Sequence, residues 1–347
     1  MKFAPVEKLD ISLFLDLAET IPVVDVRSPS EFSSGHIPGA FNIPLFDDKE
    51  RETVGINYKK EGRSKAIITG TEIAGPKMFL KLQEALKIAQ DGKLLTHCWR
   101  GGMRSEAMAW LFSLGDIEVA LLEGGYKAYR KHVLTALSEK RKSIVLGGMT
   151  GSTKTLILHQ LKKNGKQVID LERIANHKGS AFGALGQPPQ PSSEHFANLL
   201  YHEWKKLDKD IPVWLEDESR NIGNVFMPDE FYNNMQDSPT IILYMEFEKR
   251  VPRLIEEYST YSPELLKESI MKISKRLGGD NTREAIDAVE RRDFAKAVEI
   301  TLKYYDKAYL YGIRQKHTNN LISVETDTDD VAVNTDKVLN ASKNIVW

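Results

Sequence analysis

The stretch from Leu94 to Ser105 reads LLTHCWRGGMRS, and it holds the only cysteine of the 347-residue chain. A short apolar run ends at Cys98, a loop with two glycines follows, and a helix-like sequence begins after Arg104. In such a loop, backbone N–H groups and a helix N-terminus converge on the thiol, lower its pKa and stabilise a neighbouring anion. Arg100 and Arg104 add forked donors suited to phosphate-like oxyanions. We interpret Cys98 as a reactive thiol in an anion-binding loop, with a buried structural cysteine as the alternative.

Length and composition set the frame for this loop. A chain of 347 residues exceeds the usual size of one hydrophobic core, so we expect two domains. A net charge of −1 and 41% hydrophobic residues are ordinary for a globular protein. A single cysteine excludes an intramolecular disulfide and a cysteine-rich metal site, and it favours a reducing compartment. No signal-peptide core or membrane-length apolar run is present, which predicts a cytoplasmic protein that does not associate with membranes.

The sequence before and after the loop alternates between strand and helix patterns. Predicted strands occupy 21–27, 41–44, 94–96 and 119–122, and predicted helices begin near Ser28 or Ser30 and cover 76–90 and the residues up to 114. This alternation predicts an α/β domain with a parallel sheet. Ligands of such sheets bind at the carboxyl ends of strands, and Cys98 follows one such end.

Five motifs of this region, in their order and spacing, resemble a rhodanese domain: Asp25-Val26-Arg27, Glu31-Phe32, Gly35–Ala40, the Cys98 loop and Leu122–Tyr126. The resemblance implies a rhodanese-like domain over residues 1–130, in which the loop cysteine handles a chalcogen, usually as a persulfide. The spacing of Cys98 and Arg104-Ser105 also satisfies the loop pattern of cysteine-dependent phosphatases. The physics of the loop does not separate these two chemistries, whereas the upstream motifs favour rhodanese.

A second glycine loop follows the apolar strand 143–146. It comprises Gly148, Met149, Thr150, Gly151, Ser152, Thr153, Lys154 and Thr155, and an apolar helix begins behind it. Strand, glycine loop, Lys-Thr and helix form the phosphate cradle of a P-loop, in which Lys154 reaches the terminal phosphates and Thr155 can bind Mg²⁺. Thr153 replaces the glycine that usually precedes the lysine, and a β-branched residue tolerates positive φ poorly. We therefore expect a diphosphate cradle and doubt ordinary ATP hydrolysis.

Polar segments follow the next predicted strands, 167–172 and 213–215. The strand 213–215 runs into Glu216-Asp217-Glu218-Ser219-Arg220, an acidic end of the kind that holds Mg²⁺ in P-loop enzymes. A solvated loop is the alternative reading. A strand over 240–245 and a largely helical stretch over 263–316 complete the P-loop domain, which we place at 143–347. The last 25 or so residues give no clear pattern.

The segment 131–142 is predicted to be a basic connecting helix or linker. Six basic residues and one acid lie between Lys127 and Lys142. This surplus suits a phosphate backbone, and equally the solvated face of a helix.

A rhodanese domain followed by a P-loop domain closely resembles the tRNA 2-selenouridine synthase family. The segments 176–183 and 216–223 also look like segments of that family's second domain. The resemblance implies a two-stage reaction on the 5-substituted 2-thiouridine at the wobble position of tRNA. Geranyl diphosphate first alkylates the sulfur, and selenium from selenophosphate then replaces the geranylthio group.

The resemblance also assigns residues and partners. It gives Cys98 a catalytic role, either carrying selenium as a perselenide or attacking the thio-carbon. Trp99, Arg100, Gly101, Gly102, Met103 and Arg104 would bind selenophosphate, and Gly148 to Thr155 the diphosphate. A second-domain site would include Arg173, Lys178, Ser180, Phe182, Glu216, Glu218 and Arg220, with Thr155 and Glu216 as ligands of Mg²⁺. The implied partners are tRNA and an enzyme that produces selenophosphate.

Two other functions stay open from the sequence. The chain could be a rhodanese-type sulfurtransferase or regulatory protein fused to a P-loop nucleoside triphosphatase, or the rhodanese half could be an interaction module in which Cys98 is dispensable. Phe182 and Trp214 are candidates for a geranyl pocket, although both residue types are more often core.

Overall fold

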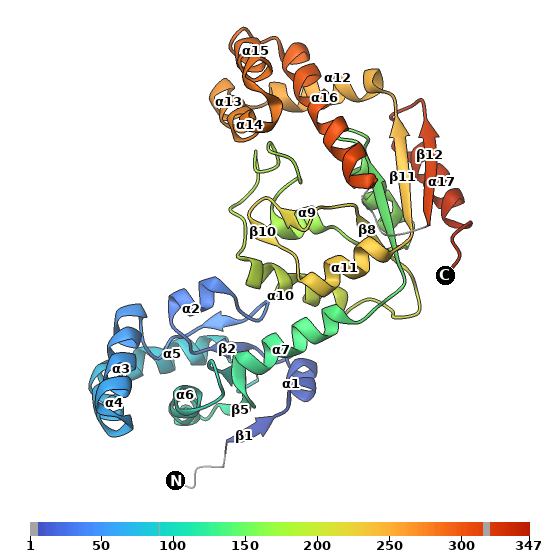
Figure 1. The fold of residues 1–347 in the computed structure, drawn as a ribbon. Helices are drawn as coiled ribbons and strands as arrows, with labels where there is room; N and C mark the ends of the chain where they lie inside the picture. Colours follow the sequence, from blue (N-terminus) through green and yellow to red (C-terminus); the bar gives the residue numbers. More distant parts are fainter. Residues whose placement is uncertain (1–5, 90, 315–319) are drawn as a thin grey trace. The chain divides into compact units, whose positions relative to one another are not determined.

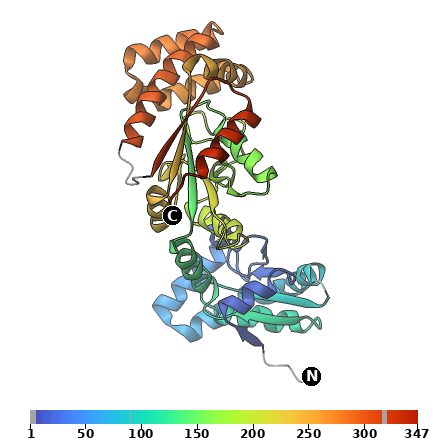
Figure 2. The same ribbon diagram turned by 90° about the vertical axis from the view of Figure 1, so that its right-hand side faces the viewer.

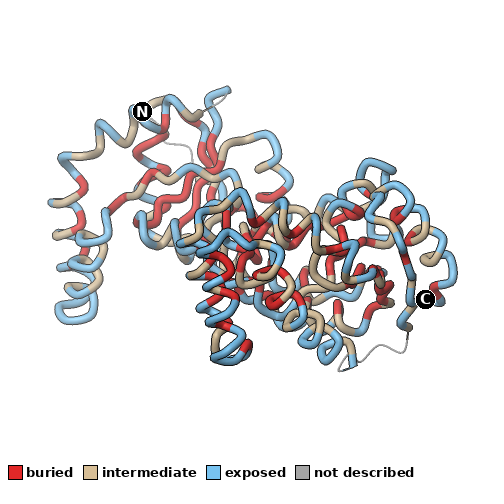
Figure 3. Tube along the Cα trace, turned by 90° about the horizontal axis from the view of Figure 1, so that it is seen from above, coloured by how far each residue is buried: buried red, intermediate tan, exposed pale blue. Residues whose placement is uncertain are grey.

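The computed structural model describes residues 6–89, 91–314 and 320–347, and it divides into two compact units, Met1–Ala136 and Leu137–Trp347 (Figure 1). Each unit contains a five-stranded sheet in which every neighbouring pair is parallel. The predicted fold class, two α/β domains with parallel sheets, is confirmed. The central strands of each sheet are buried, and most helices keep an exposed side. Figure 3 shows how buried and exposed stretches alternate along the chain.

The sheet of the first unit has the order β1-β5-β4-β2-β3. Its strands are β1 (Glu7–Leu9), β2 (Val23–Asp25), β3 (Phe41–Asn42), β4 (Lys93–His97) and β5 (Glu118–Leu122). The central strands β2 and β4 are almost entirely buried, as expected for a parallel sheet covered on both faces. Their register pairs Asp25 with His97, so β2 and β4 end side by side, immediately before Cys98.

The described residues of this unit also form α1 (Ile11–Leu17), α2 (Pro29–Ser34), α3 (Asp48–Glu61), α4 (Arg63–Ala74), the 3₁₀ turn η1 (Gly75–Lys77), α5 (Met78–Ile88), α6 (Met103–Ser113) and α7 (Gly125–Ser138), which runs into the second unit. Ser28 is the N-cap of α2, which agrees with one of the two predicted caps. The pair α3 and α4 was not predicted, because α3 buries none of its side chains and therefore shows no apolar periodicity.

The sheet of the second unit has the order β12-β11-β6-β8-β7. Its strands are β6 (Ser143–Gly148), β7 (Gln167–Ile169), β8 (Val213–Glu216), β11 (Thr240–Met245) and β12 (Leu321–Thr326), and β9 (Asn221–Ile222) and β10 (Val225–Phe226) form a separate hairpin. The register places Leu146 of β6 opposite Glu216 of β8. The glycine loop after β6 and the acidic segment after β8 therefore start at the same edge of the sheet.

The helices of the second unit form two groups. One group accompanies the sheet: α8 (Lys154–Lys163), α9 (Leu171–Ala175), α10 (Ser193–Trp204), α11 (Asp229–Asp237) and α17 (Val331–Ser342). The other gathers beyond the carboxyl end of β11 around a separate apolar cluster (Figures 1 and 2): α12 (Phe247–Ser259), α13 (Pro263–Lys272), α14 (Ser274–Leu277), α15 (Gly279–Glu290) and α16 (Phe294–Ile313).

The structure corrects two sequence-based interpretations in this unit. The predicted strand 167–172 ends at Ile169, because the Asp170 carboxylate accepts the N–H of Arg173 and caps helix α9. The last residues, which showed no clear pattern, form the edge strand β12 and the helix α17. No helix within the described ranges is long and apolar enough to cross a membrane.

Candidate functional sites: a thiol loop and a P-loop

The Cys98 loop connects the end of β4 to the start of α6, and it is clamped by the backbone after β5. Tyr126 N–H donates to Cys98 O at 2.8 Å, and Lys127 N–H donates to Trp99 O at 3.0 Å. Gly101 has a φ of +66°, and a Cβ there would lie 2.7 Å from Leu122 O. Gly125 is equally tight, since its Cβ would lie 2.4 Å from Cys98 O. The glycines of the two motifs are thus required by the close approach of two backbone segments.

Cys98 is 4% exposed and packs with the apolar core of the first unit, and the polar atoms Ser105 Oγ and Gly102 O lie against its sulfur. Ser105 Oγ donates to Cys98 Sγ at 3.3 Å. Burial raises the pKa of the Cys98 thiol, but the hydrogen bonds from Ser105 and from the Arg100 N–H, together with the charge of Arg104, outweigh burial and bring that pKa below its ordinary value. The loop therefore favours a thiolate, the reactive form of cysteine.

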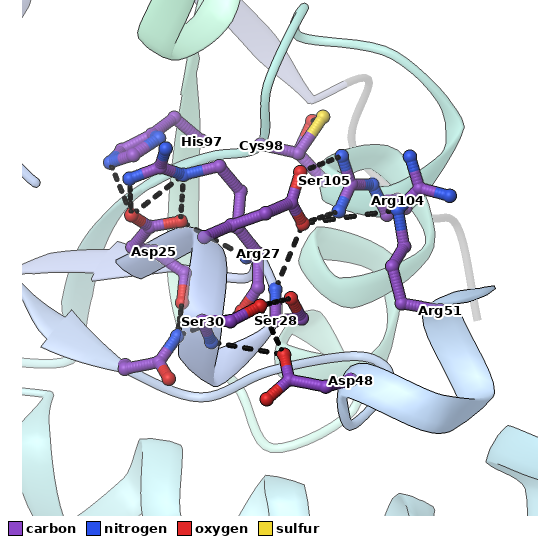
Figure 4. Close-up of polar contacts among 12 residues, drawn as sticks. Asp25, Arg27, Ser28, Ser30, Asp48, Arg51, His97, Cys98, Arg104 and Ser105 are labelled. Carbon is purple, nitrogen blue, oxygen red and sulfur yellow. Dashed lines mark hydrogen bonds and ion pairs between the residues drawn. The ribbon is translucent and has the colours of Figure 1, made fainter. Parts of the chain in front are cut away.

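A carboxylate from α2 holds Arg104 beside this thiol (Figure 4). Glu31 accepts two hydrogen bonds from Arg104, at 2.6 Å from Nη1 and 3.3 Å from Nη2. A second guanidinium, that of Arg51 on α3, lies 3.8 Å from the same carboxylate. Burial raises the pKa of Glu31, yet Arg104 and Arg51 bring it below its usual range, so Glu31 is ionised. Part of the hydrogen-bonding capacity of Arg104 is therefore already used by Glu31.

A buried ion pair between Arg27 and Asp25 supports the Cys98 loop. Arg27 Nη2 lies 2.6 Å from Asp25 Oδ2, and both side chains are almost fully buried. The Arg27 guanidinium also stacks 3.6 Å from the Tyr126 ring centroid, which links β2 to the segment that clamps the loop. The His97 ring lies 3.8 Å from the Asp25 carboxylate, and burial lowers the pKa of that imidazole. The Asp25-Val26-Arg27 motif therefore acts as a scaffold for the loop.

The other predicted residues of this loop lie on its outer side. Arg100 and Met103 are exposed, and Trp99 is half-buried with its ring 5.8 Å from that of Tyr126. Gly102 is the residue before α6, and a Cβ there would meet nothing within 4 Å. The loop thus has an open face at Gly102 and a closed face at Gly101.

The second glycine loop runs from Gly148 to Thr155, between β6 and α8. Thr153 adopts a φ of +63°, the left-handed conformation that a glycine would favour there, and its hydroxyl is buried without a hydrogen-bond partner among the residues described. The loop backbone therefore has the form of a P-loop despite the threonine. Two of its amide N–H groups already donate hydrogen bonds to protein atoms. Gly148 N–H donates to Tyr309 Oη at 2.6 Å, and Ser152 N–H donates to Met149 O at 3.1 Å.

Helices α12 and α16 hold this loop. Arg250 is almost fully buried, donates to Thr150 O at 3.0 Å and forms a two-pronged ion pair with Asp306 of α16. Tyr309, also on α16, accepts from Gly148 and donates to Asp217 Oδ2 at 3.1 Å. The glycine loop is thus fixed by side chains about 100 and 160 residues away.

Three glutamates converge beside Lys154 and Thr155. Thr155 Oγ1 lies 3.2 Å from Glu216 Oε2 and 3.3 Å from Glu172 Oε2, and Lys154 Nζ lies 3.7 Å from Glu216 Oε1. Carboxylate oxygens of Glu172, Glu216 and Glu218 all lie within 4.8 Å of one another. Gly179, at a φ of +69°, closes over them, since a Cβ there would lie 2.9 Å from Glu218 Oε1.

These carboxylates repel one another in a partly buried place. Burial and the charge of Glu216 raise the pKa of Glu172 to about 8. Burial and the charges of Glu172 and Glu216 raise the pKa of Glu218 well above its usual value. Lys154 compensates only part of this negative charge. Oxygen ligands with excess negative charge are the donor set that Mg²⁺ prefers, so the residues fit a divalent cation.

The remaining predicted residues divide into those near this cluster and those engaged elsewhere. Thr155, Lys154, Glu216 and Glu218 come together. Arg173 is exposed and lies 3.6 Å from Glu203, Lys178 pairs with Glu257, and Arg220 pairs with Asp229. Ser180 Oγ accepts the N–H of Phe182 at 3.2 Å. Phe182 stacks on Tyr258 at 4.6 Å between ring centroids, and Trp214 packs in the sheet core, so both aromatic rings are core residues in this structure.

Five residues near the two loops were missed in the sequence as site residues: Glu31 as a partner of Arg104, Arg51, Glu172, Arg250 and Tyr309. The Glu31-Phe32 motif and the predicted strand end at 170–172 were visible signals for Glu31 and Glu172. Arg51, Arg250 and Tyr309 lie in helices, and no local spacing marks them.

Fold and site define a class: a protein that joins a rhodanese-type thiol loop to a P-loop phosphate-binding domain. A family model described as a rhodanese-like domain matches residues 11–132, and one described as the tRNA 2-selenouridine synthase AAA domain matches residues 141–340. The chain belongs to the tRNA 2-selenouridine synthase family, and it is an enzyme.

Curated relatives agree over nearly the whole length. A tRNA 2-selenouridine synthase of Nitrosomonas europaea is 34% identical over 358 residues, with 88% of this chain and 92% of the relative covered. One of Pseudomonas syringae pv. syringae is 36% identical over 341 residues, with 86% and 90% covered. The crystal structure of an N-terminal domain from Clostridium difficile 630 is 37% identical and covers 37% of this chain and 99% of its own, with a TM-score of 0.35.

Proposed function

We propose that this enzyme converts the wobble 5-substituted 2-thiouridine of tRNA to 2-selenouridine in two stages, geranylation and then selenation. The observation that carries the proposal is the presence, in one chain, of a thiol loop flanked by guanidinium groups and a P-loop flanked by a lysine and three glutamates. The first suits a small tetrahedral oxyanion beside a nucleophile, and the second suits a diphosphate with a divalent cation.

The P-loop would serve the first stage. The thio sulfur attacks C1 of geranyl diphosphate, an S–C bond forms, and the C–O bond breaks so that diphosphate leaves with the electron pair. The loop amides and Lys154 stabilise the charge that develops on the leaving group. A Mg²⁺ ion held by Thr155 and Glu216, with Glu172 and Glu218 beside them, would supply further charge neutralisation. Because no γ-phosphate is cleaved, the unusual Thr153 is compatible with this stage.

The Cys98 loop would serve the second stage. The Cys98 thiolate attacks C2 of the alkylated base, the C2–S bond breaks, and geranylthiolate leaves and takes up a proton. Selenium of selenophosphate then attacks C2, and the bond from Cys98 to C2 breaks and restores the thiolate. Water finally hydrolyses the Se–P bond, with its oxygen going to phosphorus and a proton to the base nitrogen. Every step is a displacement, and no oxidant is required.

Electron balance distinguishes this route from a perselenide on Cys98. If the thiolate attacked selenium directly, the Se–P electron pair would stay on phosphorus, and phosphite would leave. The displacement route releases phosphate. Phosphorus NMR of a single-turnover reaction separates the two, and release of phosphite would replace the carbon-displacement role of Cys98 with a selenium-carrying role.

The two-stage reaction is tested by mass spectrometry of nucleosides from tRNA incubated with enzyme, geranyl diphosphate and selenophosphate. We expect 2-selenouridine from the natural enzyme, only S-geranyl-2-thiouridine from Cys98→Ser, and neither product from Lys154→Ala. Formation of 2-selenouridine by Cys98→Ser at the normal rate contradicts the role of the thiol. Nucleotide hydrolysis without any modified nucleoside would instead favour a P-loop nucleoside triphosphatase.

A further inference from the structure

Arg51 is a charged residue near Cys98 to which the proposed function gives no role. It lies on α3, and its side chain runs beside that of Arg104 near Cys98 (Figure 4), with both arginines closest to the same Glu31 oxygen, Oε2. The Arg104–Glu31 contact is a short, two-pronged hydrogen bond, whereas the Arg51 Nε atom is 3.8 Å from Glu31, too far for a hydrogen bond. Arg51 Nε is also buried and lacks a hydrogen-bond partner in the part of the chain that the structure describes.

The charges of this group balance only while Cys98 is ionised. Two guanidinium groups face the Glu31 carboxylate and the thiolate, so one positive charge is left once the sulfur is bonded to the base in the proposed displacement. Burial and the charge of Arg104 lower the pKa of Arg51, whereas the charges of Glu31 and of the Cys98 thiolate oppose this effect. Two like charges held together at a half-buried place carry an energetic cost that a further anion would relieve. Guanidinium forks match the oxygens of phosphate-like anions.

The start of α3 is anchored so that Arg51 stays in this place. Asp48 accepts from Ser30 N–H at 2.9 Å and from Ser30 Oγ at 2.6 Å, which ties the first turn of α3 to α2. Asp47 and Glu50 form a capping box at the same turn. Arg51 is therefore positioned by α2, the helix that also carries Glu31, and independently of the glycine loop.

We propose that Arg51 is the second guanidinium of an oxyanion site over Cys98, that it binds the phosphoryl oxygens of the selenium donor together with Arg104, and that Glu31 positions both arginines. This inference deepens the proposed function and rests on it for the identity of the donor. The anion class, a tetrahedral phosphate-like oxyanion, follows from the two guanidinium forks beside the sulfur.

The single cysteine of the chain provides a test of anion binding that does not depend on catalysis. Inorganic phosphate is titrated against the rate at which iodoacetamide alkylates Cys98, measured on the intact protein by mass spectrometry. We expect phosphate to slow alkylation of the natural protein, and the phosphate concentration for half-protection to rise about tenfold in Arg51→Ala, the loss typical of one charge-assisted contact. Arg51→Lys keeps the charge but loses the fork, and it should fall between the two.

Arg63→Ala is the matched control, because Arg63 is an exposed arginine at the start of the neighbouring helix α4. It removes the same charge and should leave protection unchanged. If Arg51→Ala binds phosphate as well as the natural protein does, or if phosphate protects none of the proteins, the inference is overturned. If Arg51→Ala does not fold, Arg51→Lys decides, and protection equal to that of the natural protein then counts against the fork.

Steady-state kinetics separates this inference from the proposed function. Arg51→Ala should raise the KM for selenophosphate about tenfold and leave the geranylation rate unchanged. A loss of both activities would point to a structural role for Arg51 and count against the inference. If the natural protein makes no 2-selenouridine while phosphate protection still depends on Arg51, the two-stage function fails and the oxyanion site stands.

Discussion

Replacing Ser105 by alanine tests how the loop activates its thiol. Ser105 Oγ donates to Cys98 Sγ at 3.3 Å, and this hydrogen bond is the largest influence that lowers the pKa of the thiol against the effect of burial. A hydrogen bond to a charged group contributes roughly 1.5–3 kcal/mol. We place this one at the lower end, because the single hydroxyl proton of Ser105 is shared with Gly102 O, which lies 2.9 Å from Oγ. Loss of this contribution in Ser105→Ala should raise the pKa of Cys98 and lower the thiolate fraction about tenfold, since about 1.4 kcal/mol corresponds to a factor of ten.

The assay is the pH dependence of Cys98 alkylation by iodoacetamide, which reports only this residue because the chain has no other cysteine. Below the pKa of the thiol, the rate follows the thiolate fraction, so Ser105→Ala should react about tenfold more slowly there. At high pH, where both thiols are ionised, the rates should converge or cross slightly, because a more basic thiolate is the better nucleophile.

Ser113→Ala is the control for this prediction. Ser113 lies at the far end of the same helix α6, and its hydroxyl donates to Trp110 O of its own turn at 2.8 Å. Its substitution should leave the pH profile of Cys98 in place. Coincident profiles for Ser105→Ala and the natural protein would refute the reasoning, since backbone N–H groups and Arg104 would then suffice to stabilise the thiolate.

Three further predictions concern backbone strain and the glutamate cluster. Gly101→Ala should lower the free energy of unfolding of the first unit by about 2–5 kcal/mol, because it combines a positive φ with an added Cβ 2.7 Å from Leu122 O. Gly102→Ala has open space around the new Cβ and should lower the free energy of unfolding by less than about 1 kcal/mol. Equal denaturation midpoints for the two variants would contradict this prediction. The raised pKa of Glu172 gives stability that is complete below the ordinary carboxyl pKa and is lost as the pH rises through about 8. Glu172→Gln should therefore have a higher melting temperature than the natural protein at pH 8–9, but not at pH 5, and it should be stabilised less by added Mg²⁺. A melting-temperature difference that stays constant across pH would contradict this prediction. Thr153→Gly should not lower the melting temperature, since it relieves a left-handed threonine with a buried unpaired hydroxyl, whereas Thr155→Gly, inside helix α8, should lower it; a clear loss in Thr153→Gly would show that the threonine is unstrained.

The local sequence was sufficient to predict the two loops, since each is a continuous strand–loop–helix unit. The Cys98 loop and the Gly148–Thr155 loop are both defined by residues within about a dozen positions, and glycine placement follows from their backbone geometry. The same locality explains the strand 240–245, which the structure reproduces at the same residues. Periodicity and turn chemistry act over this range, so they could be interpreted without tertiary information.

Local sequence failed where burial is decided by distant partners. Helix α3 has no buried side chain and therefore no apolar stripe, although it carries Arg51. The segment 167–172 was interpreted as a single strand because Val168, Ile169 and Leu171 are all apolar, yet the Asp170 cap starts a helix within it. Strand β12 alternates between exposed and less exposed residues, but its place at the sheet edge depends on its parallel register with β11.

The sequence by itself determined that this chain contains one loop built for a thiolate and one built for a phosphate, because each depends on neighbouring residues. Only the tertiary structure decided what stands beside each loop: Glu31 and Arg51 from α2 and α3 near Cys98, and Glu172 near Lys154. These neighbours lie on separate helices that follow strands of the two parallel sheets, and the strand ends of each sheet converge although they are far apart in the chain. No motif in the sequence marks residues that are brought together in this way, because strand order and helix packing determine which strand ends lie next to each other.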